Sequence, residues 1–242
     1  MFWAKAVLFD MDGVVIDTRQ SVIDFWEAVA AEHRVTLTDD DFDRHIHGVP
    51  AAATLRSLFP GLSSEQTAAV MDRSAQYERG LQYTEVAGVT RFLKQLTDAG
   101  VKAGLVTSGT RWKVEDVLQQ LQLDGRFDVI VTAGDIERGK PDPACYLAAA
   151  GKLGAHGAEC VVFEDSLAGV RAAKAAGAAC VGVQTGGRVK LIKAEGVQGV
   201  IPDFTSIEGS VEPSAVRVRI GDEFVFDVAR GLNRFQKEPD ET

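Results

Sequence analysis

Short apolar runs alternate with longer amphipathic stretches along most of this chain. Each run is apolar at consecutive positions, not at every second one, which is typical of strands buried on both faces of a sheet. The amphipathic stretches between the runs indicate helices that pack on those faces. The pattern therefore predicts an α/β fold in which a doubly wound parallel sheet forms a Rossmann-like core. The predicted strands lie at residues 4–9, 101–106, 127–131, 160–163 and 179–183.

Residues 18–83 interrupt this alternation, because they contain amphipathic patterns but no strand-like run. The helical patterns lie at residues 21–32, 51–59 and 63–80. A long helical insertion directly after the first strand predicts a second small domain over the tips of the sheet. We therefore expect a core formed by residues 1–17 and 84–208, and an α-helical cap formed by residues 18–83.

Residues 209–242 follow a third pattern. The segment VRVRI, the turn signal Gly221-Asp222 and the segment EFVFDV alternate apolar and polar positions, which predicts a β-hairpin. The hairpin either covers an edge of the chain's own sheet or contacts another subunit or partner. The last residues, KEPDET, are typical of a solvated tail.

Composition and charge exclude some classes of partner. A net charge of −9, with no cluster of Lys and Arg, argues against binding to nucleic acid. The first apolar run reaches Asp10 too soon for a signal sequence or a membrane span, and no later run is long enough, so we expect a cytoplasmic protein without a membrane partner. Cys145, Cys160 and Cys180 are far apart in the sequence and odd in number, which predicts buried, reduced thiols.

Two aspartates, Asp10 and Asp12, stand where the first apolar run ends. Alternate residues of a strand face the same side, so both carboxylates can face one point. Two like charges this close are costly unless a cation or a shared proton compensates them. The pair therefore indicates a divalent cation or a chemical role, and Gly13 allows the chain to turn away.

Two later segments of the predicted core also carry polar residues that could take part in chemistry. Thr107 and Ser108 end an apolar run, and a helix is predicted to begin near Arg111, so their hydroxyl and N–H groups form either an anion site or an ordinary helix cap. Lys140 precedes Pro141, which restricts it to an extended conformation from which its ammonium group can project as a fixed charge. A solvated side chain is the alternative for a loop lysine.

Glu164 and Asp165 follow another apolar run, and Ser166 is placed to cap the next helix. Adjacent carboxylates at a buried strand tip repel each other and Asp10 unless a hard cation is present. Oxygen ligands are those that Mg²⁺ prefers. Together with Asp12 these residues predict a magnesium site formed by Asp10, Asp12, Glu164 and Asp165.

The order of these motifs, DxDGV, a strand ending in Thr, Lys-Pro and Glu-Asp-Ser, resembles that of the haloacid dehalogenase superfamily of phosphotransferases. The resemblance covers the whole predicted core. The insertion between the first and second motifs is similar to the α-helical cap of the subgroup that contains β-phosphoglucomutase and small sugar-phosphate phosphatases. It implies a Mg²⁺-dependent enzyme that acts on a small phosphorylated metabolite, as a monomer or a small homo-oligomer.

The resemblance also implies a role for each motif. Asp10 is the nucleophile that forms an aspartyl phosphate, and Asp12 is the general acid and base. Mg²⁺ is held by side-chain oxygens of Asp10 and Asp165 and by the backbone carbonyl of Asp12, while Glu164 supports the site. The phosphoryl oxygens are bound by Thr107, the Ser108 amide and Lys140.

The cap decides between the activities that this resemblance allows. In β-phosphoglucomutase-like caps, a histidine and an arginine that holds the distal phosphate fall at the positions of Val22 and Ala51. Since both are absent here, hydrolysis to a sugar or polyol and phosphate is favoured over a mutase. A binding protein on the same fold is a further alternative. Dehalogenation is disfavoured because it needs no acid such as Asp12.

Four side chains are candidates for contacts between the cap and the substrate. His47 is the first of them, because it lies in the segment IHGVPAAATL, which resembles the cap loop of sugar and polyol phosphatases. We expect His47 to contact substrate hydroxyls. His45 is the second, and an ordinary surface or N-terminal helix histidine is the alternative for both histidines. The others are Arg19 and Arg56, for which a solvated helix face is an equal explanation.

Overall fold

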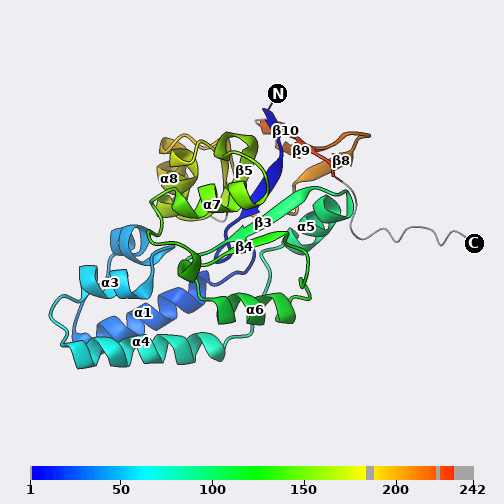
Figure 1. Ribbon diagram of the computed structural model, residues 1–242. Coiled ribbons are helices and arrows are strands. Elements are labelled where there is room, and N and C mark those ends of the chain that lie inside the picture. The colour runs from blue at the N-terminus through cyan, green and yellow to red at the C-terminus, as the bar shows by residue number, and fades with distance from the viewer. Residues whose placement is uncertain (1, 184–187, 222–223, 232–242) are drawn as a thin grey trace, which may run out of the picture.

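A computed structural model describes residues 2–183, 188–221 and 224–231. Among these residues, six parallel strands form the main sheet, in the order β4-β3-β2-β5-β6-β7 (Figure 1). They are β2 (Ala6–Phe9), β3 (Lys102–Val106), β4 (Val129–Val131), β5 (Cys160–Glu164), β6 (Ala179–Val183) and β7 (Gly199–Ile201). The predicted doubly wound α/β fold is confirmed. Only the short β7 was not predicted among these strands, because three residues give no distinct run.

Helices cover both faces of this sheet (Figure 1). Val7 and Phe9 of β2 face one core with α5 and α6, whereas Ala6 and Leu8 face a second core with α7, α8 and α9. Alternate residues of one strand thus supply two cores, as its unbroken apolar run predicts. The helices are α5 (Val89–Asp98), α6 (Arg111–Gln120), α7 (Ala144–Lys152), α8 (Leu167–Ala175) and α9 (Val189–Ala194), with 3₁₀ turns η2 (Ala133–Asp135) and η3 (Gly157–Glu159).

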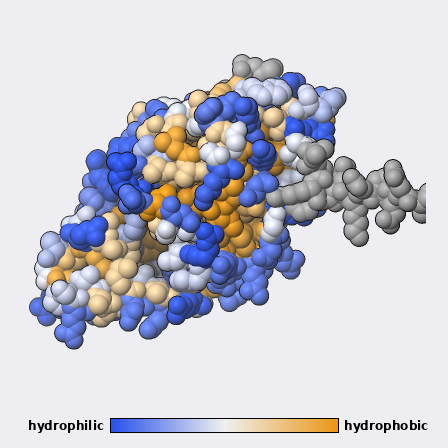
Figure 2. Space-filling model, viewed as in Figure 1, coloured by the Kyte–Doolittle hydropathy of each residue, from blue (hydrophilic) through white to orange (hydrophobic). Residues whose placement is uncertain are grey.

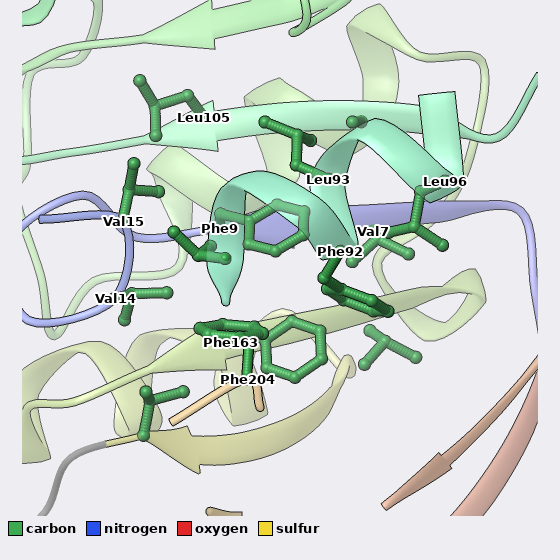
Figure 3. Packing of buried hydrophobic residues seen from close by; sticks show 14 of the residues in the cluster. Val7, Phe9, Val14, Val15, Phe92, Leu93, Leu96, Leu105, Phe163 and Phe204 are labelled. Atoms are coloured by element: carbon green, nitrogen blue, oxygen red, sulfur yellow. The ribbon is translucent and has the colours of Figure 1, made fainter. Parts of the chain in front are cut away.

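Four phenylalanines form the centre of the first core (Figure 3). Phe9 of β2 and Phe163 of β5 stack with their ring centroids 5.3 Å apart, and Phe92 and Phe204 stack at 5.6 Å. Burial of a phenylalanine side chain contributes about 1.5–3 kcal/mol to stability. This packing fixes β2 and β5 beside each other just before the residues that carry the predicted chemistry.

Helices make up the inserted segment between β2 and β3, at the lower left of Figure 1. They are α1 (Arg19–His33), α2 (Asp39–Asp41), the π-helical turn η1 (Phe42–Ile46), α3 (Ala51–Leu58) and α4 (Ser64–Arg79). The three predicted helices are present, and α2 and η1 were not predicted. Phe25, Trp26 and Phe59 belong to a separate hydrophobic cluster within this segment, with Trp26 and Phe59 stacked at 5.9 Å.

The predicted C-terminal hairpin is present as β9 (Ala215–Ile220) and β10 (Phe224–Ala229), paired antiparallel. Its strands do not join the main sheet, although Ile220 and Phe224 lie close to Gly199 of the edge strand β7. Instead β1 (Phe2–Ala4) pairs parallel to β10, and β8 (Glu208–Val211) pairs with β9, so a second sheet forms in the order β1-β10-β9-β8. The first apolar run is divided at Lys5 between the two sheets. The predicted tail, residues 237–242, lies outside the described residues.

The second sheet packs on its own chain. Val216, Val218, Phe226 and Val228 are buried in the same core as the four phenylalanines. Figure 2 shows hydrophilic side chains around the periphery of one face of the molecule and apolar ones near its middle. Within the described ranges, no helix is long and apolar enough to cross a membrane. The three cysteines are buried and free, as predicted.

Candidate active site

Three carboxylates meet at the carboxyl ends of β2 and β5. Asp10 directly follows β2, and its N–H donates to the carbonyl oxygen of Phe163 over 3.0 Å. Glu164 ends β5, and Asp165 follows it. One oxygen from each of Asp10, Glu164 and Asp165 lies within 4.8 Å of the others, and all three residues are buried. Because neighbouring parallel strands end at the same edge, the register of β2 and β5 brings these groups together.

Asp12 has different partners. Its Oδ1 accepts hydrogen bonds from Thr18 Oγ1 and from Lys113 Nζ, each over 2.9 Å. Asp12 is not part of the group of three carboxylates within 4.8 Å of one another, because β2 ends at Phe9 and the turn, not strand alternation, places the Asp12 side chain. Gly13 has a φ of +81°, and a Cβ there would overlap the Asp165 carboxylate, so this turn requires glycine.

Lys140 is buried at the same strand tips. Its Nζ donates to Asp10 Oδ1, to Glu164 Oε1 over 2.7 Å, and to the carbonyl oxygen of Val106 over 3.4 Å. Burial alone lowers the pKa of Lys140, but the charges of Asp10 and Glu164 outweigh burial and raise the pKa above its ordinary value. The side chain is thus a fixed, internal positive charge and not a solvated loop lysine.

Glu164 is saturated with hydrogen bonds. Its Oε1 accepts from Lys140 and, over 2.8 Å, from the Tyr146 hydroxyl. Its Oε2 accepts from the Asp165 N–H over 2.9 Å and from the Ser166 N–H and hydroxyl over 3.0 Å. Burial tends to raise the pKa of Glu164, but Lys140 and these donors lower it, so the carboxylate is ionised. A carboxylate offers about four lone-pair sites, so these five donors leave none of them free.

The other two carboxylates lack such compensation. Burial raises the pKa of Asp10 well above its ordinary value, and Glu164 and Asp165 add to this while Lys140 opposes it. Burial, followed by the charge of Glu164, raises the pKa of Asp165 to about 7, although Arg188 lies 3.4 Å from its Oδ2. A divalent cation would relieve this excess of negative charge. The donors are all oxygen atoms, so the residues present fit Mg²⁺.

The predicted anion-binding residues lie at the tip of β3. Thr107 is buried, and its Oγ1 accepts a hydrogen bond from the Gly109 N–H over 2.9 Å. Ser108 is half-buried and lines a cavity of about 150 Å³ between the core and the inserted helices. Helix α6 begins at Arg111, as predicted. The turn therefore presents Ser108 to the cavity while Thr107 holds the backbone.

This cavity also contains residues of the cap, the name that we keep for the inserted residues 18–83. Arg19 and His47 line it, and both also line an adjoining cavity of about 320 Å³. Burial, and then the positive charges of Arg188 and Arg19, lower the pKa of His47 to about 3, so its imidazole is neutral. His45 and Arg56 line neither cavity, and Arg56 is exposed.

Two buried cations were not predicted. Lys113 of α6 lies between Asp12 and the cap residue Glu78, with Nζ 2.9 Å from Asp12 Oδ1 and 3.1 Å from Glu78 Oε1. The sequence carried a signal for it, since Lys113 shares the buried face of α6 with Val117, four residues later. Arg188, the other cation, has its Nε 3.3 Å from Oδ1 of Asp43 in the cap.

Proteins of similar sequence identify the family of this chain. A family model described as haloacid dehalogenase-like hydrolase matches residues 7–183. Validoxylamine A 7'-phosphate phosphatase of Streptomyces hygroscopicus subsp. limoneus is 35% identical over 184 residues, 75% of this chain and 86% of its own length. Hexitol phosphatase A of Escherichia coli (strain K12) is 35% identical over 185 residues, covering 74% and 82% respectively. Beta-phosphoglucomutase of Bacillus subtilis (strain 168) is 30% identical over 194 residues, covering 75% and 84%. The resemblance suggested by the four motifs is confirmed, and the chain belongs to the haloacid dehalogenase-like hydrolase family.

Proposed function

We propose that this protein is a Mg²⁺-dependent phosphatase that hydrolyses a small phosphorylated sugar, polyol or related metabolite through an aspartyl phosphate. The main support is the buried group of Asp10, Lys140, Glu164 and Asp165, of which Asp165 lines a cavity between the core and the cap. Phosphatases that are 35% identical to the chain support the same reaction class.

In the first step, a carboxylate oxygen of Asp10 attacks phosphorus, and the bond from phosphorus to the alcohol oxygen breaks. Asp12 gives its proton to the departing oxygen, so the alcohol leaves neutral. Lys140 orients Asp10 and, with Thr107 and the Ser108 amide, contacts the phosphoryl oxygens. Mg²⁺, held by Asp10 and Asp165, would supply positive charge that lets a phosphoryl dianion approach a carboxylate.

In the second step, water attacks the aspartyl phosphate and phosphate departs from Asp10. Asp12, now ionised, takes the proton of that water and regains its acid form. Glu164 does not react in either step. Its hydrogen bonds hold the Lys140 ammonium group and the backbone of Asp165 in place, and through them it supports the predicted metal site.

The cavity supports a small alcohol as the leaving group. The cavity volume of about 150 Å³ is many times the roughly 10–15 Å³ that one water-sized probe needs, so a small hydroxylated molecule fits in it. Neutral His47, Ser74 and Glu78 line it and can exchange hydrogen bonds with hydroxyl groups. Val22 and Ala51 also line it, so those two positions offer no charge to a second phosphate, which favours hydrolysis.

A mutase is the second candidate, because of the beta-phosphoglucomutase relative. The two activities differ in what is released: a phosphatase produces free phosphate from a monophosphate, whereas a mutase requires a bisphosphate and conserves the phosphoryl group. Measuring free phosphate and isomerised sugar phosphate from the same esters, with and without a bisphosphate, distinguishes the two activities.

The test is a phosphate-release screen over sugar and polyol monophosphates with Mg²⁺, using the full chain. We expect release from at least one ester, none from Asp10→Asn, and none after chelation of the metal. Asp17→Asn is the matched control, since Asp17 is exposed and lies in the same loop. Substantial activity of Asp10→Asn, or in excess chelator, would contradict the proposal. The cytoplasmic location and the monomer or small homo-oligomer stay predictions.

A further inference from the structure

We propose that Lys113 is a positioning residue that couples closure of the cap to proton transfer by Asp12. The inference rests on the proposed function, in which Asp12 is the acid and base. It concerns a group that none of the four sequence motifs contains. Lys113 belongs to α6 of the core, Asp12 to the loop after β2, and Glu78 to the last turn of α4 in the cap.

The geometry makes Lys113 the link between the two acids. The residue is 5% exposed, and Asp12 and Glu78 are both half-buried at the rim of the same cavity. An ammonium group has three donors, so Lys113 can hold both carboxylates at once. Because Glu78 comes from the cap, this three-residue arrangement is complete only while the cap lies over the core.

Both donors to Asp12 use the same oxygen. Thr18 Oγ1 and Lys113 Nζ each donate to Oδ1, which concentrates negative charge on that atom. These two contacts leave Oδ2 as the oxygen that carries a proton to the leaving alcohol. Lys113 thus fixes the rotation of the carboxylate and decides which of its oxygens reacts.

Charge balance explains why closure matters. The Lys113 ammonium lies 2.9 Å from Asp12 Oδ1 and 3.1 Å from Glu78 Oε1, so it balances the charge of both carboxylates. If the cap moves away, Lys113 loses one carboxylate and its environment admits water, so its hold on Asp12 weakens. Lys140 cannot substitute for it, because its contacts are with Asp10 and Glu164.

A purely structural role for Lys113 predicts a different result from a positioning role. An alkoxide leaves poorly unless an acid protonates it, whereas p-nitrophenolate is stable without a proton. A residue that positions Asp12 is therefore needed for alkyl phosphates in the first step and much less for p-nitrophenyl phosphate. General distortion of the site slows both substrates.

The experiment compares wild type and Lys113→Met in the full chain with Mg²⁺. Substrates are the best alkyl monophosphate from the screen and p-nitrophenyl phosphate. We expect kcat for the alkyl ester to fall at least tenfold with little change in KM, while the initial burst of p-nitrophenolate keeps its rate within about threefold. Steady-state turnover after the burst falls too, because the second step also needs Asp12. Lys113→Arg restores part of the alkyl activity.

Glu78→Gln tests the coupling to the cap without removing Lys113. We expect the same selective loss for the alkyl ester, smaller in size. Lys94→Met, at an exposed lysine paired with Asp98, is the matched control and keeps wild-type rates. Equal losses for both esters in Lys113→Met, or no loss, overturn the positioning role, and unchanged alkyl hydrolysis in Glu78→Gln overturns the coupling.

Failure of the proposed function gives a distinct pattern. In that case wild type releases no phosphate from any ester, and this inference falls with it. If wild type is active and Asp10→Asn is not, the proposed function stands, and the Lys113 and Glu78 variants decide the inference separately. Thermal unfolding of each variant identifies any that does not fold. If Lys113→Met does not fold, Glu78→Gln and Lys113→Arg still test the inference.

Discussion

Lys140 Nζ lies 2.7 Å from Glu164 Oε1, and both side chains are at most 2% exposed. Breaking a buried ion pair by removing one partner leaves an uncompensated charge and costs about 3–5 kcal/mol. We therefore expect Lys140→Met to lower the free energy of unfolding by about that amount. We also expect kcat to fall by a factor on the order of 10² or more, since Asp10 loses its donor. Urea unfolding and phosphate release measure the two effects.

The control for Lys140 is again Lys94→Met, which removes an exposed charge and should change stability by less than about 1 kcal/mol. If Lys140→Met unfolded at the wild-type urea concentration, the ion pair with Glu164 would not stabilise the fold as argued.

Metal binding should stabilise the protein through Asp10 and Asp165, whose negative charge is not fully compensated by Lys140 and Arg188. Mg²⁺ at 100 times its dissociation constant adds about 2.7 kcal/mol to the stability of a protein that binds it only when folded. We expect Mg²⁺ to raise the melting temperature of the wild type but not of Asp165→Asn. A thermal melt with and without Mg²⁺ measures this. Asp17→Asn should respond like wild type, and an equal response of Asp165→Asn would exclude Asp165 as a ligand.

The strand tips were predictable because their signals are local. Asp10, Thr107, Lys140 and Glu164 each stand directly beside an apolar run or a proline, and parallel strands bring such positions to one edge. The sequence does not show which of these polar side chains are held by hydrogen bonds and which remain available to a metal ion or substrate. Only the structure separates Glu164, saturated by donors, from Asp165, which is not.

The contacts between core and cap were not predictable in the same way. Lys113 and Arg188 each meet an acid from the cap, Glu78 or Asp43, that is far away in sequence. Nothing local specifies such a pairing. The same holds for β1, whose partner β10 lies more than two hundred residues later. In each case the tertiary arrangement, not the local pattern, decides the partner.

His47 should make stability depend on pH. Its folded pKa of about 3 lies below the ordinary 6.5, so between these values the unfolded chain binds a proton that the folded chain does not. Stability therefore rises with pH over this window and is lost as the pH falls below 6.5. The loss is about 1.4 kcal/mol per pH unit, or about 2 kcal/mol between pH 6.5 and 5.

The measurement is urea unfolding of wild type and His47→Gln at pH 8, 7, 6.5 and 5. We expect the variant to lose about 2 kcal/mol less than wild type between pH 6.5 and 5. The difference in stability between the two proteins should change by no more than about 0.2 kcal/mol from pH 8 to 7, where His47 is mostly neutral in both states, which serves as an internal control. Parallel curves down to pH 5 would show that His47 is not held neutral.

Gly48 lets the cap loop rest on the core. Its φ is +74°, and a Cβ at this position would overlap Ser166 Oγ, which accepts a hydrogen bond from the Gly169 N–H at the N-terminus of α8. Gly48→Ala should therefore force the loop away from Ser166 and also strain the backbone, which costs about 1–2 kcal/mol. Because the loop carries His47 into the cavity, we expect kcat/KM for the best ester to fall about tenfold, a loss of about 1.4 kcal/mol in transition-state binding. Gly61→Ala is the matched control, since this cap glycine has open space around it. Equal activity of the two variants would mean that contact between the loop and Ser166 is not needed for turnover.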